Sequence, residues 1–315
     1  MNKWIGGAML AGVSVMNLSA LAQDVENLDE GQATAAPMGQ STNQSVLMPI
    51  KVSSGVSEQF NTDVKSGGSF SITRFKVGTV VPLRLGDDFV LSSSVRYGLD
   101  SFTFKGIPST WTHTWHNIDT LTLASVLTWR LDDTWSVYGG GLVKWSAESG
   151  ADWGNAAIGG GLAGFNYKVD DTLTLGAGLA VVGQIENDTS VLPLITAKWQ
   201  FADNWRLDVG LADVATAGYG GKLNWLFDKQ LEFGLGAQFH KSRFRLQYAD
   251  GVGQEQAAAL YIDSTWHATP NFDVNAFVGI AAGGQLRVDS SNGRELTSSD
   301  YDPAGMLGLN ASFKF

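Results

Sequence analysis

One nine-residue pattern of apolar and polar positions occurs six times along the chain. In Trp129–Val137 an aromatic, a polar and an apolar residue precede three turn residues, and an apolar, a polar and an apolar residue follow them. Each copy predicts a tight three-residue hairpin between two strands that alternate apolar and polar side chains. The six copies are Leu83–Leu91, Trp129–Val137, Tyr167–Leu175, Trp199–Leu207, Trp225–Phe233 and Trp266–Val274.

Longer and more variable connections separate these hairpins. They cover roughly residues 61–68, 105–116, 147–155, 187–190, 214–219, 247–255 and 289–303. Short turns that alternate with long loops are typical of a transmembrane β-barrel, whose short turns are periplasmic and whose long loops face outward. The pattern therefore predicts an all-β, antiparallel transmembrane β-barrel.

The hairpins also give an approximate strand count. Six turns join twelve strands, and the segments Val46–Phe60 and Ala304–Phe315 add one each, which predicts about fourteen. Pro49 interrupts the first segment and Gly220–Phe227 is short, so twelve or sixteen strands are alternatives.

Side-chain alternation predicts which face meets lipid. In Trp135–Trp145 the odd-numbered residues include both tryptophans and two valines, whereas the even-numbered ones include Lys144. Ten steps of about 3.3 Å at a tilt of about 40° cover roughly 25 Å, the height of an apolar band bounded by aromatic girdles. The alternative is a soluble β-sandwich in which these aromatic residues form the core.

The N-terminus predicts secretion. A basic start and the apolar run Trp4–Met16 precede the small-residue site Ala20–Ala22, so residues 1–22 are predicted to be a signal peptide cleaved near Ala22. Residues 23–45 are polar and acidic, and we interpret them as a flexible periplasmic segment. Residues 46–315 are then the barrel domain.

The C-terminal segment carries a family resemblance. Leu307, Leu309, Ala311, Phe313 and the final Phe315 alternate with small or polar residues. This resembles the C-terminal strand of Gram-negative outer-membrane β-barrel proteins. The resemblance implies a porin-like barrel in the cell outer membrane, in contact with membrane lipid and lipopolysaccharide, and recognition of Phe315 by the barrel-assembly machinery.

Composition narrows the classes of function. The 315 residues include no cysteine, which excludes disulfides, thiolate metal sites and a lipid-anchored N-terminal cysteine. The formal net charge of −10 argues against a nucleic-acid partner. No glycine-rich phosphate loop opens a helix, so no cofactor is expected.

The residues predicted to face the lumen are rich in bases. The inward residue just before the last apolar position ahead of each turn is Arg84, Arg130, Lys168, Gln200, Leu226 or His267, and Lys314 before the final Phe completes the set. Five of these seven are basic or titratable and would form a partial ring at the periplasmic mouth. Such a ring favours anions in an aqueous pore. We therefore predict a passive channel or small-solute transporter with a net basic lumen that favours anionic or polar solutes. The other candidate lumen-lining residues are Arg96, Lys144, Lys198 and Arg206.

The alternative function is a structural or surface-interaction barrel with a blocked lumen. In that case the inward bases pair with neighbouring acids such as Glu232 and Asp273. Many inward glycines, among them Gly178 and Gly236, favour open space instead. Lys241, Arg243 and Arg245 are predicted to face outward, where they could meet lipopolysaccharide phosphates.

A barrel enzyme is the weakest interpretation. The stretch Asp289–Arg294 resembles the His-x-Ser-Asn-Gly motif of outer-membrane phospholipases, but Asp289 stands where that motif has its essential histidine. A serine without a base is not activated. His113 and His116 are too few for a metal site and are expected to lie in a loop that caps the barrel.

Overall fold

The computed structural model of the chain describes residues 47–109, 111, 114–186, 189–212, 215, 218–247 and 251–315. The predicted signal peptide (1–22) and the segment 23–45 lie outside the described residues, as does His113. Those expectations stay predictions.

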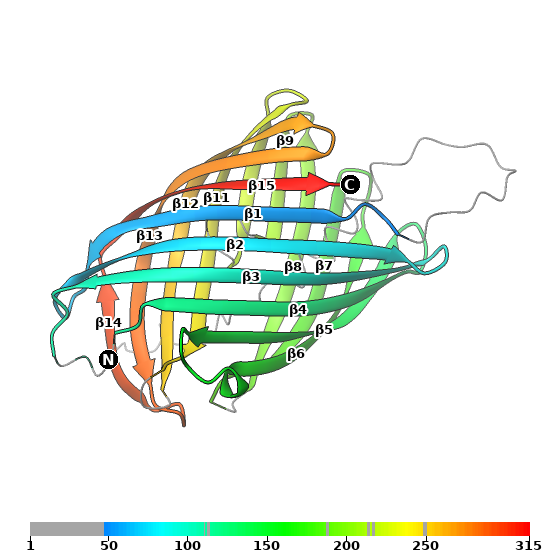
Figure 1. The fold of residues 1–315 in the computed structure, drawn as a ribbon. Coiled ribbons are helices and arrows are strands. Elements are labelled where there is room, and N and C mark those ends of the chain that lie inside the picture. Colours follow the sequence, from blue (N-terminus) through cyan, green and yellow to red (C-terminus); the bar gives the residue numbers. More distant parts are fainter. Residues whose placement is uncertain are drawn as a thin grey trace, which may run out of the picture.

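The described chain forms one sheet that closes into a barrel (Figure 1). Neighbouring strands pair antiparallel from β1 to β13, and β15 lies between β13 and β1 and completes the ring. A short 3₁₀ helix, η1 (Gly154–Ala156), precedes β6. The strands are β1 (Lys51–Asp63), β2 (Ser69–Arg84), β3 (Phe89–Lys105), β4 (Asn117–Arg130), β5 (Trp135–Glu148), β6 (Ala157–Lys168), β7 (Leu173–Gly183), β8 (Thr189–Ala202), β9 (Trp205–Ala212), β10 (Gly218–Leu226), β11 (Leu231–Arg245), β12 (Val252–Thr269), β13 (Phe272–Asp289), β14 (Glu295–Tyr301) and β15 (Ala304–Lys314).

The last two strands are one wall position divided by a proline. Tyr301 of β14 pairs with Gly284, and Ala304 of β15 pairs with Ala281, so both strands keep the same register on β13. Pro303 lies between them and has no N–H to donate to the ladder. The barrel therefore has fourteen wall positions, which confirms the predicted number. The predicted loop 289–303 was wrong in extent, because residues 295–301 are strand.

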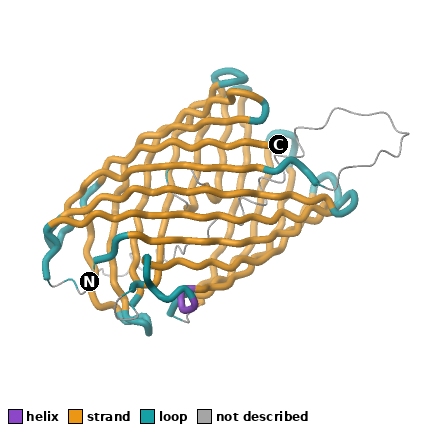
Figure 2. Tube along the Cα trace, viewed as in Figure 1, coloured by secondary structure: helices purple, strands orange, loops and turns teal. Residues whose placement is uncertain are grey.

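Six short turns lie at one end of the barrel, here called the turn end, and the long connections lie at the other, the loop end (Figure 2). In the turn after β4, the Asp132 carboxylate accepts the amides of Thr134 and Trp135, both at 2.7 Å. Asp170 and Asp228 accept the equivalent pairs in their turns. These carboxylates satisfy turn amides that would otherwise bond only to water.

Two of the six turns are one residue shorter than predicted. Ala202 pairs with Trp205 and Thr269 pairs with Phe272, which leaves two residues in each turn. Both ladders contain a register shift just before the turn, so the extra residue is absorbed as a bulge in the strand.

The outer face of the barrel is apolar, as the alternation predicted. Trp129, Trp199 and Trp266 of the repeat are 45%, 42% and 52% exposed. Aromatic rings from adjacent strands pack at the turn end, with 5.5 Å between the centroids of Phe89 and Trp129. One sheet that closes on itself with an apolar outside fits a strand-built membrane protein and excludes the β-sandwich alternative. Among the described residues, no helix is long and apolar enough to cross a membrane.

Candidate functional site

The residues predicted to form a ring occupy equivalent positions at the turn end. The backbone amide of Arg130 donates to the carbonyl of Asp88 in the preceding turn at 2.8 Å, and that of Lys168 donates to Thr134 at 2.8 Å. The same bond recurs at Gln200, Leu226, His267 and Lys314, whose acceptors are Thr172, Asn204, Gln230 and Asn271. Arg84, the last residue of β2, occupies the corresponding position before the first turn.

Acidic neighbours compensate part of this ring. The Lys168 Nζ lies 2.7 Å from the Asp171 carboxylate in the adjacent turn. The His267 Nδ1 lies 2.6 Å from Asp273 on the next strand. Both contacts are partly exposed, so water screens them and their contribution to stability is small.

Higher in the lumen, β9 to β13 carry a continuous network of polar side chains. Arg206 bonds to Asp208 at 2.9 Å and to Glu232 at 3.0 Å. Lys222 lies 3.3 Å from Asp263, which also accepts a hydrogen bond from Asn275 at 2.6 Å. The charge of Arg206, one of the predicted selectivity residues, is therefore balanced by two carboxylates.

An ionic bridge crosses the inside of the barrel toward the loop end. Arg74 on β2 lies 3.3 Å from Glu255 on β12, although three wall positions separate these strands. Glu255 also contacts His240 at 2.6 Å and accepts the Tyr301 hydroxyl at 2.7 Å. We call Arg74, His240, Glu255 and Tyr301 the ionic bridge. Sequence reasoning missed Glu255 because it fell in a predicted loop.

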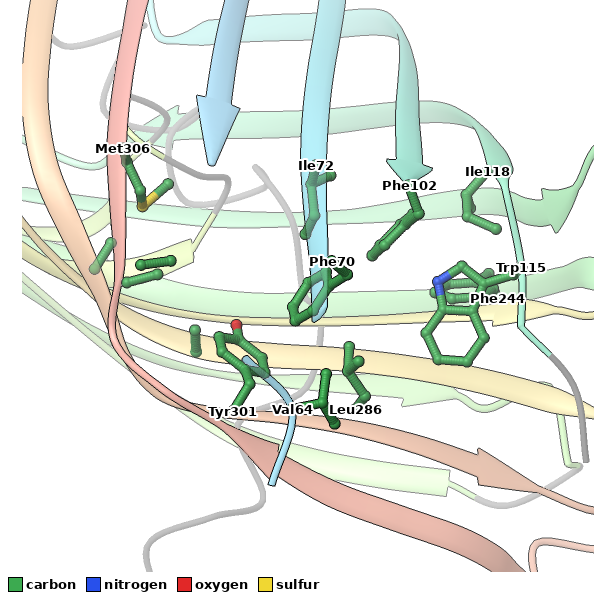
Figure 3. Packing of buried hydrophobic residues seen from close by; sticks show 14 of the residues in the cluster. Val64, Phe70, Ile72, Phe102, Trp115, Ile118, Phe244, Leu286, Tyr301 and Met306 are labelled. Atoms are coloured by element: carbon green, nitrogen blue, oxygen red, sulfur yellow. The ribbon is translucent and has the colours of Figure 1, made fainter. Parts of the chain in front are cut away.

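An aromatic lid covers the ionic bridge on its loop-end side. Trp115 lies with its ring centroid 5.7 Å from that of Phe102 and 5.2 Å from that of Phe244, and Phe70 lies 4.9 Å from Tyr301 (Figure 3). These five aromatic residues, which we call the aromatic lid, come from β2, β3, β11, β14 and the loop before β4. They are at most 6% exposed.

The backbone closes the same region. Arg245 at the end of β11 forms a parallel bridge with Ala147 on β5, across the mouth of the barrel. The next residues continue this contact, since the Gln247 amide donates to the Glu148 carboxylate at 2.9 Å. The predicted exposure of Arg245 to lipopolysaccharide was wrong, because Arg245 is 8% exposed. Arg243 lies on the face of β11 opposite Phe244, 2.8 Å from Asp289, and contact of Lys241 or Arg243 with lipopolysaccharide stays a prediction.

A second apolar cluster lines the lumen on β4 to β8. We call it the apolar wall; it comprises Ala124, Val126, Tyr138, Leu142, Leu162, Ala180, Val182 and Leu194. Predicted site residues surround it. Lys144, 2% exposed, lies two residues above Leu142 on the same face of β5, and Lys198 lies on the inner face of β8 toward the turn end.

The inward ionisable residues differ between the two halves of the barrel. Six of the eight predicted site residues lie on β2 to β8: Arg84, Arg96, Arg130, Lys144, Lys168 and Lys198. The half from β9 to β15 holds Arg206 and Lys314, together with Lys222 and the acids Asp208, Glu232, Glu255, Asp263 and Asp273, whereas Asp100 lies on β3. Most of the predicted lumen bases therefore lie on one side of the barrel.

Several inward glycines lie in close contact with neighbouring atoms. A Cβ on Gly236 would lie 2.3 Å from the Tyr261 ring, and one on Gly178 would lie 2.6 Å from the carbonyl of Ala163. At Gly234 the Asp263 carboxylate would be 2.1 Å away. At Gly234 and Gly236 inward side chains fill the space that a Cβ would take, so these glycines do not by themselves indicate an open lumen.

The enzyme-like stretch has a structural role. Asp289 lies 2.8 Å from Arg243 and 2.5 Å from Arg287, and it is 1% exposed. The Ser290 hydroxyl donates to the side-chain oxygen of Asn292 at 2.6 Å. Within the described ranges, no group of three or more histidine or acidic side chains could hold a metal ion.

A closed fourteen-strand wall, an apolar outer face with aromatic residues at its rim, and polar side chains inside define an outer-membrane β-barrel protein. The chain belongs to the family described as "Domain of unknown function (DUF6268)", whose model matches residues 94–313. No curated protein matches the chain.

Solved structures resemble this barrel at low sequence identity. The COG4313 outer membrane channel from Pseudomonas putida F1 has a TM-score of 0.48 and 10% identity, over 89% of this chain and 100% of that chain. A Pseudomonas aeruginosa FadL homologue has a TM-score of 0.44 and 10% identity, over 84% and 89%. The NanC porin has a TM-score of 0.37 and 14% identity, over 84% and 100%. We infer no solute from these likenesses.

Proposed function

We propose that this barrel is an outer-membrane transporter for small anionic solutes that also have an apolar portion. The observation that carries the proposal is the juxtaposition of the apolar wall with most of the inward bases on β2 to β8. The apolar wall is at most 8% exposed in this structure, so it would meet a solute only in an open state, where removing hydrocarbon from water gains about 25 cal/mol per Å². Bases next to it attract the anionic group and lower its energy in the lumen.

The sequence predicted anionic or polar solutes, and the proposal narrows this class to anions that have an apolar portion. A purely polar anion would need only the bases, and an apolar surface of this kind would give it nothing. Arg84, Arg130, Lys168 and Lys198 lie between the apolar wall and the turn end, and Lys144 lies beyond it on the other side. A carboxylate with an aliphatic chain can contact both kinds of surface at once.

A second candidate function is a surface-interaction barrel whose lumen stays blocked. The aromatic lid, the ionic bridge and the β5–β11 contact favour it, because together they connect opposite sides of the loop end. In the transporter these contacts form a closed state that must open. In the blocked barrel they are permanent.

Planar bilayers that contain the purified barrel separate the two functions. With octanoate and octylammonium salts, the transporter should give an open state whose reversal potential shows preference for the carboxylate. Arg84→Glu combined with Arg130→Glu should weaken or reverse that preference. Lys65→Glu combined with Lys105→Glu is the matched control, since both residues are exposed at the loop end. Unchanged selectivity in the first double variant contradicts the role of the bases, and a barrel that never conducts supports the blocked alternative.

A further inference from the structure

The barrel wall contains a seam between β8 and β9. The ladder joining these strands consists of Ala202↔Trp205, Trp199↔Leu207, Lys198↔Asp208 and Ala197↔Val209, and within the described residues it ends there. On their other sides both strands stay paired: β8 with β7 up to Thr189, and β9 with β10 up to Ala212. In this register Leu194, Ile195 and Thr196 face Gly210–Ala212, and they have no ladder partner on β9.

A glycine marks the point where β9 leaves β8. Gly210 follows the last paired residue, Val209, and has a φ of 147°. This region of φ is readily adopted by glycine and rarely by residues with a Cβ. With ordinary strand angles at position 210, β9 would continue alongside β8 and bring this position opposite Thr196. The backbone angle of Gly210 therefore turns β9 away from β8.

The exposed edge of β8 is adapted to the missing ladder. The Tyr219 hydroxyl on β10 donates to the carbonyl of Ile195, so this carbonyl points toward β9. Backbone groups two residues apart in a strand point to the same side, hence those of Pro193, next to the gap, point the same way as the Ile195 carbonyl. Because proline has no N–H, it places no unsatisfied donor there. In a membrane every unpaired backbone group costs several kcal/mol, so these two features lower the cost of an interrupted wall.

Both faces of β8 are apolar along the seam. Leu194 on the inner face belongs to the apolar wall and Leu192 packs against it. On the outer face Val191 and Ile195 are 60% and 58% exposed, toward the hydrocarbon. An apolar chain that moves from the inner to the outer face at this position would stay in contact with aliphatic side chains throughout.

We infer that the seam between β8 and β9 is a lateral route by which the apolar portion of the solute passes between the lumen and the hydrocarbon of the membrane. The inference rests on the proposed function, because only a solute with an apolar portion would gain by leaving through the wall. The hydrogen bond from Tyr219 to Ile195 holds the seam closed when no solute passes.

An engineered disulfide tests this route. The chain has no cysteine, so two introduced residues form a defined pair. If β9 moved back into the register of Ala197↔Val209, Ile195 would lie opposite Leu211, so a disulfide between Ile195→Cys and Leu211→Cys would trap a closed ladder. The control is Ala163→Cys with Leu179→Cys, which pair in the intact β6–β7 ladder. The readout is uptake of radiolabelled dodecanoate by cells whose outer membrane carries the variant, against cells without the barrel.

We expect oxidation to abolish barrel-dependent dodecanoate uptake in the seam variant and a reductant to restore it, while the control variant transports in both states. Equal uptake by the oxidised and reduced seam variants, with the disulfide verified, overturns the lateral route alone. If the reduced variants and the unmodified barrel all fail to take up dodecanoate, the proposed function fails instead.

A second variant covers the case in which the seam disulfide prevents assembly. Tyr219→Phe removes the hydroxyl that bonds to Ile195 and keeps the ring. Faster dodecanoate uptake than by the unmodified barrel supports the route. A rate unchanged by this substitution counts against a seam held closed by Tyr219.

Discussion

The two ends of the barrel are built in different ways. At the turn end, each connection contacts residues within the same repeat or the one before it, as when the Lys168 amide bonds to Thr134. At the loop end, the contacts join parts of the chain far apart in sequence, such as Arg74 with Glu255 and Arg245 with Ala147. The repeat therefore specifies the wall, whereas the non-repeating segments specify what closes it.

This difference has a physical cause. A three-residue turn between paired strands is determined by local hydrogen bonds and by the residues that can adopt its backbone angles. Long segments at the loop end bury aromatic side chains against strands that are distant in sequence. Which strand lies within reach of such a segment depends on the geometry of the whole barrel. Changes at the turn end should therefore affect assembly, and changes at the loop end should affect whether the barrel is open.

The largest effect is expected from deletion of Phe315. Its backbone exchanges two hydrogen bonds with Ile50, of 2.9 and 3.0 Å, and its ring centroid lies 5.5 Å from that of Phe313. The deletion removes the contacts that join the two ends of the chain, and also the residue that we propose the barrel-assembly machinery recognises. We expect loss of most folded barrel from the outer membrane, measured by heat-modifiable gel mobility. Phe315→Tyr keeps the aromatic ring and should assemble, and normal assembly of the deletion variant contradicts this role.

Next in size is the effect of Trp115→Ala in the aromatic lid. Trp115 is fully buried and its ring packs on Phe102, Phe104 and Phe244. Truncation of a buried tryptophan costs about 3–5 kcal/mol. Because the lid lies on the lumen side of an intact wall, we expect the barrel to assemble and its open probability in planar bilayers to rise.

A matched change at the turn end sharpens this result. Trp129→Ala also removes a tryptophan, but this residue is 45% exposed on the outer face of the repeat. It should reduce the yield of assembled barrel and leave the open probability unchanged. An increase in conductance from both variants would show that the lid is not the closing element.

The same contrast explains which features sequence reasoning could predict. The repeat has the two-residue period of a strand, so it predicts the number of strands and which side chains face lipid. It also predicts that Arg130, Lys168 and Lys314 occupy equivalent positions, and the structure has all of these features. Glu255 could not be assigned to the lumen, because its segment lacks the repeat and its partners lie on other strands. The alternative function anticipated that Glu232 would pair with an inward base, but that this base is Arg206 depends on which neighbouring side chains meet inside the barrel.

The smallest effect is expected at a turn carboxylate, where the repeat is most local. Hydrogen bonds from the hydroxyl and the amide of Thr172 hold the pKa of Asp170 below its usual value of 3.8. A carboxyl whose pKa is lower in the folded state stabilises that state above its unfolded pKa, and this contribution is lost as the pH falls through the folded pKa.

Asp170→Ala should therefore lower the unfolding temperature slightly at neutral pH, and the difference from the unmodified barrel should shrink below about pH 3.8. Thermal unfolding followed by circular dichroism at several pH values measures this difference. A difference that stays constant as the pH falls through that range would mean that the charge on Asp170 does not stabilise the turn. The turn end would then be held by its backbone ladder alone, since that ladder is the same in both proteins.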